Sequence, residues 1–417
     1  MEIFVLFPRV PLLTSLPFIK KQSPAKVLKV KTLLARISRV TTTGFYIPEL
    51  DGLRALAIFA VFLMHLVDFG GAYHLLPKPT SSLEFCVNRM SIAGGLGVAL
   101  FFAISGFIIS MPFQAAFFLK QKQVSISAFY KRRLTRLEPP YLISLVFLLL
   151  ARLWLGDEKP LELVKSFFLS AFYMHNITAG SASLINPVAW SLEIELQFYL
   201  LAPFLLFIYC RLNPILRKTI LAVFTILLIA IRPESWRWQH SVLGVFEYFA
   251  TGVLIADICL IKWNRSLPRL SRCDFCSVLT VAFLFSTALL PPSKTASLLR
   301  AASIFLFVLF VLGSKYLSSF FGNPWIAALG GMCYTYYLYH SSLLFLSTKV
   351  CKLLFRKLEY FQAYLTLVFF GGFLTIFACT LLFIFFERPF MHREWPSNFY
   401  FFLKRLFTKK LLSNEHA

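Results

Sequence analysis

Two ionisable side chains, Arg54 and His65, stand eleven residues apart in the apolar stretch YIPELDGLRALAIFAVFLMHL of residues 46–66. In a helix this spacing covers about three turns, or ~16 Å, and places both side chains on nearly one face. Arginine binds phosphate through paired hydrogen bonds, and histidine acts as a general base near neutral pH. A single histidine in an apolar helix more often only bonds a neighbouring carbonyl group, so the chemistry of His65 depends on other polar residues nearby.

Ionisable residues recur in two later apolar stretches, NPVAWSLEIELQFYLLAPFLL (186–206) and YTYYLYHSSLLF (334–345). If the first enters the membrane from the outer face and the second from the inner face, Glu195 and His340 reach a depth similar to that of His65. A carboxylate can hold a histidine in one tautomer and prepare it to remove a proton from a hydroxyl group. Proton-relay transporters use the same residue types, so this pattern alone does not separate an enzyme from a transporter.

A basic cluster supplies a second kind of chemistry. Arg133 and Arg136 are three residues apart in RRLTRLEPPY (132–141), just before Pro139 and Pro140 begin the next predicted span. The spacing lets both guanidinium groups face one ligand, and the planar guanidinium matches a phosphate group better than lysine does. The alternative is that the cluster sets membrane topology or contacts anionic lipid.

The composition is that of an integral membrane protein. The chain has 417 residues, of which 58% are hydrophobic and 15% charged, and its mean hydropathy is +0.72. Apolar stretches of about 20 residues recur from residue 50 to 386, the length at which a helix crosses the hydrocarbon core. The formal net charge is +23, but the Lys and Arg residues lie in short loops between these stretches, so we expect no nucleic-acid partner.

The positions of the basic residues predict an all-α, polytopic bundle of ten transmembrane helices with both termini cytoplasmic. Residues 1–45 form a basic cytoplasmic segment, residues 46–390 the transmembrane domain, and residues 391–417 a basic cytoplasmic tail. Residues 131–136 fall in a cytoplasmic loop, and residues 166–187 form an outer-face or re-entrant segment. The predicted spans are 46–66, 92–113, 141–155, 188–210, 219–231, 241–262, 275–291, 298–313, 325–348 and 361–386. One loop breaks the rule, because its basic residues fall outside: Lys349, Lys352, Arg356 and Lys357.

Three further patterns carry weaker signals. The close pair Cys273 and Cys276 lacks a second Cys or His pair, so we expect no metal site. Ser105 precedes Gly106 without the pattern of a nucleophile elbow, which favours helix packing. Asn176 begins a formal Asn-Ile-Thr glycosylation sequon.

Taken together, the motifs resemble the acyltransferase 3 family of membrane acyltransferases. ELDGLRALAIFAVFLMH resembles the family's first-helix signature, a basic residue followed by ten others and a histidine, and RRLTR contains its Arg-x-x-Arg pair. GVALFFAISGFIIS resembles its second helix, NPVAWSLEIELQFYLL its Trp-Ser-Leu, acidic, Gln-Phe-Tyr stretch, and YTYYLYH and FERPF its late signatures. Many members have a second acidic residue in place of Leu196, and often a Trp in place of Tyr339.

The resemblance implies a ten-helix enzyme that O-acylates carbohydrates such as surface polysaccharides or glycolipids. The donor would be cytoplasmic acetyl-CoA or another acyl-CoA, with no metal. Arg133 and Arg136 would engage the phosphates of CoA, Arg54 would help to hold the donor, and His65 would be the catalytic base. From the residues alone, either Glu195 or His340 would orient His65 or the acceptor, and the sequence does not decide between them. The protein would be a multi-pass protein of a cell membrane, the cytoplasmic (inner) membrane if the source is bacterial.

Two other functions are compatible with the same polar residues. A transporter or exporter of a glycan or lipid-linked substrate would use them as its substrate path, although the chain lacks paired halves with broken helices at matching positions. A scaffold with structural polar residues would tolerate lysine at Arg133 and Arg136.

Overall fold

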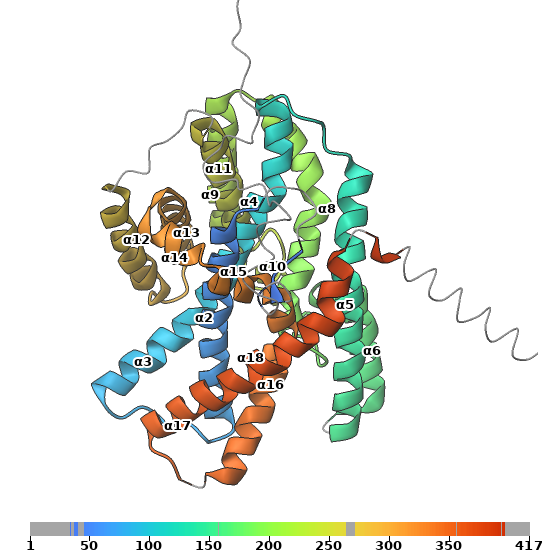
Figure 1. Ribbon diagram of the computed structural model, residues 1–417, viewed down its shortest axis with the longest axis vertical. Helices are drawn as coiled ribbons and strands as arrows, with labels where there is room; N and C mark the ends of the chain where they lie inside the picture. The colour runs from blue at the N-terminus through green and yellow to red at the C-terminus, as the bar shows by residue number, and fades with distance from the viewer. Residues whose placement is uncertain are drawn as a thin grey trace, which may run out of the picture.

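The computed structural model describes residues 34, 37–40, 46–156, 158–263, 272–355, 357–392 and 394–396, and these residues form helices joined by turns (Figure 1). In chain order the elements are α2 (Pro48–Ala72), α3 (Ser82–Ile92), η3 (Ala93–Gly95), α4 (Leu96–Phe118), α5 (Ile126–Leu155), α6 (Pro160–Ala171), α7 (His175–Thr178), η4 (Pro187–Ala189), α8 (Trp190–Arg211), α9 (Pro214–Ile231), α10 (Trp236–Gln239), α11 (Phe246–Trp263), α12 (Arg272–Ala288), α13 (Lys294–Gly313), α14 (Tyr316–Phe321), α15 (Pro324–Gly331), α16 (Cys333–Leu354), α17 (Tyr360–Thr366), η5 (Leu367–Gly371), α18 (Gly372–Leu382), η6 (Phe383–Glu387) and η7 (Arg388–Met391). The all-α membrane class predicted from the sequence is therefore confirmed.

Seven helical stretches in the described part of the chain are long and apolar enough to cross a membrane. They are Pro48–Ala72, Ser82–Phe118, Ile126–Leu155, Pro187–Arg211, Pro214–Ile231, Lys294–Gly313 and Tyr360–Met391. Helices α11, α12 and α16 occupy the three other predicted spans. The count of ten and the cytoplasmic location of both termini stay predictions, and most of residues 1–45 and of 391–417 lie outside the described residues.

Helix α2 runs through the middle of the bundle and packs closely against its neighbours (Figure 1). A Cβ added to Gly97 of α4 would lie 2.4 Å from the carbonyl oxygen of Ala57, and one added to Gly330 of α15 would lie 1.6 Å from that of Asp51. Only glycine permits such close approach between membrane helices. The contact at Gly330 holds the start of α2, where Asp51 and Arg54 stand.

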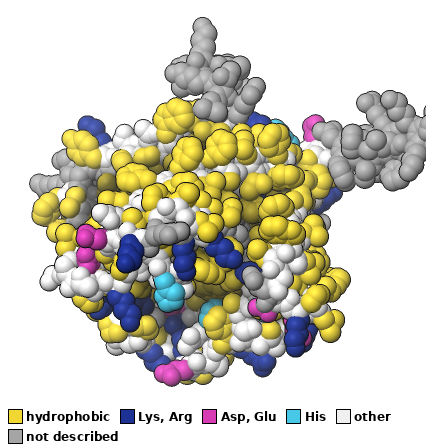
Figure 2. Space-filling view, turned by 90° about the horizontal axis from the view of Figure 1, so that it is seen from below, with side chains coloured by type: hydrophobic (Ala, Val, Ile, Leu, Met, Phe, Trp, Pro, Cys, Tyr) yellow, Lys and Arg dark blue, Asp and Glu magenta, His cyan; other side chains and the backbone are white. Residues whose placement is uncertain are grey.

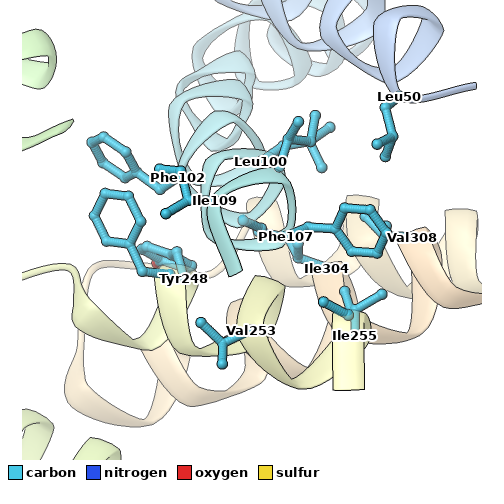
Figure 3. Packing of buried hydrophobic residues seen from close by; sticks show 14 of the residues in the cluster. Leu50, Leu100, Phe102, Phe107, Ile109, Tyr248, Val253, Ile255, Ile304 and Val308 are labelled. Carbon is cyan, nitrogen blue, oxygen red and sulfur yellow. The ribbon is translucent and has the colours of Figure 1, made fainter. Parts of the chain in front are cut away.

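The largest apolar core lies where α4 crosses α11 and α13 (Figure 3). Phe102 and Phe107 of α4, Val253 of α11 and Ile304 of α13 are all buried there. This core fixes α4 on one side of α2, and two of its members, Phe129 and Tyr199, contact the side chain of Arg133.

Helix α5 corrects the predicted boundary of the third span. It begins at Ile126, where the hydroxyl group of Ser125 accepts a hydrogen bond from the amide of Ala128, and it continues through Pro139 and Pro140. Arg133 and Arg136 therefore stand on a helix and not in a loop. Because Pro139 has no amide hydrogen, it leaves the carbonyl of Thr135 free, and the indole Nε1 of Trp395 donates to that carbonyl at 2.9 Å.

Two further segments are not single continuous helices. The predicted span 325–348 is broken at Met332 into α15 and α16. Residues 166–187 contain the second half of the short helix α6, the four-residue helix α7 and turns, and no helix in this segment is long enough to cross a membrane. The expected absence of a full crossing in this segment agrees with its short helices, and its location at the outer face stays a prediction.

Candidate active site

Arginine side chains gather at the start of α2, which we call the arginine end. The buried carboxylate of Asp51 accepts hydrogen bonds from Nη1 of Arg54 at 2.5 Å and from Nη1 of Arg39 at 3.2 Å. Asp51 is 1% exposed. Because a buried carboxylate must be paired, Asp51 fixes both guanidinium groups in place.

Arg136 of α5 reaches the same end of the bundle. It interacts electrostatically with Arg39, Arg54, Asp51 and Glu387, and its buried Nε has no hydrogen-bond partner. Glu387 is itself held by α16, since it accepts hydrogen bonds from the amide and the hydroxyl group of Thr335. Three arginines around two carboxylates leave a net positive charge, as a site for an anionic group requires.

Arg133 and Glu195 form the second part of the arginine end. The Arg133 guanidinium lies 4.0 Å from the ring centre of Phe129 and 5.0 Å from that of Tyr199. Tyr199 donates its hydroxyl hydrogen to Oε2 of Glu195 at 2.7 Å, and Ser105 donates to Oε1 at 2.6 Å. The Glu195 carboxylate interacts electrostatically with both Arg54 and Arg133.

Glu195 thus belongs with the arginines and hydrogen bonds to neither His65 nor His340. The sequence placed it beside the histidines from the depth of its span alone. The rotation of α8 turns Glu195 toward Ser105 of α4, whereas Glu193 turns toward the amide of Asn176, 2.8 Å away. Ser105, which the sequence assigned to packing, is a hydrogen-bond donor to this carboxylate.

The two histidines meet near the opposite end of α2, which we call the histidine end. The ring centres of His65 in α2 and His340 in α16 are 5.3 Å apart, with an angle of 45° between the ring planes. Nδ1 of His65 lies 3.5 Å from Oδ2 of Asp68, one turn further along α2. The two histidines expected at similar depth are therefore neighbours, and their depth in the membrane stays a prediction.

The hydrogen bonds of His340 determine its tautomer. Its Nδ1 lies 2.8 Å from the carbonyl oxygen of Tyr336 and 3.0 Å from that of Tyr337. Carbonyl oxygens only accept hydrogen bonds, so Nδ1 carries the hydrogen and Nε2 keeps a lone pair. Nε2 is buried and has no partner. Fully buried His340 therefore presents an unused acceptor beside His65, whose side chain is 20% exposed.

Hydrogen bonds with residues 186–192 hold α16 in this position. Asn186 donates through Nδ2 to the carbonyl of Leu338 at 3.0 Å. The hydroxyl group of Tyr337 donates to the carbonyl of Val188 and accepts from the amide of Leu192 at 3.2 Å. Asn176 is also part of this packing, since it is 1% exposed and donates to the carbonyl of Trp190 at 2.8 Å. Its side chain is therefore not accessible to glycosylation in the folded protein.

Sequence reasoning missed several residues of both ends. Asp68 was within reach, because it stands three residues after His65 on the same helix face. Arg39 carried no local signal, and Glu387 stood in the FERPF stretch without a role assigned to it; each meets α2 or α16 only through the tertiary fold. Among the described residues, no group of three or more His, Cys, Asp or Glu side chains is arranged to hold a metal ion; the side chain of Cys273 lies outside them.

The sequence profile of the acyltransferase 3 family, described as an acyltransferase domain, matches residues 47–384. The chain belongs to the acyltransferase 3 family. The matched region contains α2, α5, α8 and α16, the helices that carry the histidine pair and most of the arginine end. The matched acyltransferase domain thus coincides with a described region that contains several helices long and apolar enough to cross a membrane.

Curated relatives of this acyltransferase 3 chain are named O-acetyltransferases. O-acetyltransferase OatA of Staphylococcus aureus (strain NCTC 8325 / PS 47) is 31% identical over 197 residues, covering 45% of this chain and 29% of the relative. Peptidoglycan O-acetyltransferase OatA of Listeria monocytogenes is 27% identical over 343 residues, covering 74% of this chain and 51% of the relative. The matches thus span about half the length of these relatives or less. No solved structure matches the chain.

Proposed function

We propose that this acyltransferase moves an acetyl group from cytoplasmic acetyl-CoA, or another acyl-CoA, to a hydroxyl group of a carbohydrate at the outer face of a cell membrane. The names of the relatives support O-acetylation as the reaction. Their bacterial origin supports the cytoplasmic membrane as the location. The transmembrane acyltransferase unit would comprise residues 46–390, between the basic segments 1–45 and 391–417.

One structural relationship carries the proposal: α2 bears Arg54 at the arginine end and His65 at the histidine end, ~16 Å apart along the helix axis. An acyl-CoA is elongated, with phosphates at one end and the thioester at the other. Its phosphates would bind Arg133 and Arg136, with Arg54 and Glu195 positioning the charged part, and its thioester would extend to His65. A cavity of about 180 Å³ between α5 and α8, lined in part by Arg133 and Tyr199, lies beside the arginine end.

In the proposed reaction, His65 removes the proton from the acceptor hydroxyl group, and the oxygen attacks the thioester carbonyl. The carbon–sulfur bond then breaks, the ester forms, and the proton passes to the departing thiolate of CoA. Asp68 would stabilise the positive charge that His65 acquires. The free Nε2 of His340 would accept a hydrogen bond from a neighbouring hydroxyl group of the acceptor, which leaves the attacking hydroxyl group to donate its hydrogen to His65.

The proposal is tested with radiolabelled acetyl-CoA and membranes that contain equal amounts of each variant. The variants are His65→Ala, the double variant Arg133→Ala with Arg136→Ala, and His392→Ala, a matched control at an exposed histidine. Label should enter extracted carbohydrate with the wild type and the control but not with the other two. If no acceptor pool takes up label in a histidine-dependent way, the enzyme reading is wrong for this substrate class, and transport of a glycan becomes the function to test.

A further inference from the structure

An aromatic and basic surface adjoins His65 on the side away from the arginines. It consists of Phe69 and Tyr73 from α2 and its end, and Phe345 and Lys349 from α16; we call it the Lys349 surface. Nζ of Lys349 lies 4.4 Å from the ring centre of Phe345, which lies 5.4 Å from that of Tyr73. Phe69 connects the surface to His65, with ring centres 6.2 Å apart.

The turn after α2 holds these rings in place. His74 adopts a left-handed backbone conformation with φ of 55°, and the amides of Leu75 and Leu76 both donate to the carbonyl of Gly70, at 3.0 and 2.9 Å. Leu75 and Leu76 are then buried against α2 and α17. The position of Tyr73 is therefore fixed by buried packing on both sides of it in the chain.

The charge of this end of the bundle is unusual for an outer face. Lys349, Lys352 and Lys357 are exposed, and Figure 1 shows the end of α16 and the start of α17 at the same end of the bundle as the end of α2. In the predicted topology these lysines lie outside, where the positive-inside rule disfavours them. On this predicted topology, the three lysines would have a role other than setting topology.

Other charged groups share this end of the molecule. Figure 2 looks at it from below and shows histidine, lysine and arginine side chains gathered on this face among apolar ones. Lys78 and Arg89 are exposed, and the acidic side chains of Asp68, Glu84 and Glu359 lie on the same end. The lysines of α16 and of the segment after it thus favour a negatively charged ligand.

We propose that the Lys349 surface binds the acceptor, and that the acceptor is an acidic carbohydrate bearing carboxylate groups. Aromatic rings pack against the apolar faces of sugar rings, and Lys349 supplies the opposite charge for a carboxylate. The surface ends at His65, so a bound sugar presents a hydroxyl group to the histidine pair. This inference rests on the proposed function, because it names the substrate class of that site.

The test measures binding of two labelled oligosaccharides by the purified protein in nanodiscs of neutral lipid, which removes anionic lipid as a competitor. The probes are an oligogalacturonate and its carboxyl-reduced, neutral counterpart. The acidic probe should bind about fivefold to tenfold more tightly, and the difference should shrink at high ionic strength. Equal binding of the two probes to the wild-type protein, or no binding of either, would overturn the inference.

Variants locate the site. Lys349→Glu should weaken binding of the acidic probe about fivefold to tenfold and leave the neutral probe unaffected, whereas Lys349→Arg should bind as the wild type does. Lys122→Glu is the matched control, an exposed lysine between α4 and α5. An equal loss in the control would place the charge effect elsewhere and overturn the assignment of the surface. Charge-dependent binding without transfer to any acceptor would refute the proposed function and leave the binding site standing.

Discussion

The imidazole rings of His65 and His340 face each other across helices α2 and α16, with ring centres 5.3 Å apart. The two residues differ in their surroundings. His65 is partly exposed and has Asp68 beside Nδ1, whereas His340 is buried with Nδ1 bonded to two carbonyl oxygens. We therefore assign different roles to them, with His65 as the base and His340 as the group that orients the acceptor.

Replacing His340 should reduce transfer less than replacing His65. His65→Ala removes the general base, which is typically worth 10²–10⁴-fold in rate, so kcat should fall by about that factor. His340→Ala should lower kcat by about tenfold, since it removes one neutral hydrogen bond. The measurement is acetyl transfer at saturating donor and acceptor. A larger loss for His340→Ala than for His65→Ala would exchange the two roles.

Lysine at Arg136 should not replace arginine. Arg136→Lys keeps the charge but loses the planar donors, so we expect the KM for acetyl-CoA to rise about tenfold with little change in the KM for the acceptor. Lys131→Ala, a change at an exposed position five residues earlier on α5, serves as the control. If Arg136→Lys and Arg133→Lys both behave as the wild type, the arginines have a topological or structural role only.

Replacing Glu195 tests whether this residue acts at the arginine end. Glu195→Gln keeps an oxygen that can accept from Ser105 or Tyr199 but removes the charge near Arg54 and Arg133. The expected effect is a higher KM for acetyl-CoA, by about threefold to tenfold, with the KM for the acceptor unchanged. Initial-rate kinetics with each substrate varied in turn separate the two. A change confined to the acceptor KM would place Glu195 with the histidines after all.

Asp51→Asn should weaken both the fold and the donor site. It removes the buried negative charge that Arg39 and Arg54 share, and loss of one partner of a buried ion pair typically costs about 3 kcal/mol. We expect a lower midpoint of thermal unfolding in detergent and a raised KM for acetyl-CoA. The double variant Asp51→Asn with Arg39→Gln should recover part of the lost stability, because it also removes one of the unpaired cations. No recovery would mean that Asp51 acts through Arg54 alone.

The segment of residues 160–190, which contains His175, should lose stability in mild acid. Burial lowers the pKa of His175, whose Nδ1 donates to the carbonyl of Ser181 and whose Nε2 accepts from Ser166, each at 3.0 Å. The unfolded chain then binds more protons, so this contribution is complete above the ordinary histidine pKa of about 6.5 and is lost as the pH falls below it. Hydrogen exchange of residues 160–190 at pH 7 and pH 5 measures it. Equal protection at both pH values would contradict the expectation.

Much of the fold was predictable because membrane helices are recognisable in a sequence by their length and apolar composition. The first span, its Arg54–His65 spacing and the meeting of His65 with His340 all follow from helical geometry and depth. The start of α5 was predicted too late, because Pro139 and Pro140 were interpreted as the beginning of the span. The sequence does not show that Trp395 donates a hydrogen bond to the carbonyl that a proline leaves free. A helix boundary of this kind depends on a partner far away in the chain.

The sequence predicted which residues belong to the site better than it predicted which of them lie together. The depth of a residue follows from its distance along a span, but the direction of its side chain depends on how the helix is rotated against its neighbours. Glu195 shows the difference, because it faces Ser105 and Tyr199 and not the histidines. Arg39 shows another limit, since its contact with Asp51 depends on the tertiary path of a segment with no motif.

The central claim is that donor and acceptor meet across the membrane along α2. Proteoliposomes carrying the purified protein test it directly, with labelled acetyl-CoA and a membrane-impermeant carbohydrate acceptor placed on opposite sides or on the same side. Transfer should occur only when the two substrates are on opposite sides, and His65→Ala should abolish it. Equal transfer with both substrates on one side, or full activity of His65→Ala, would contradict the account.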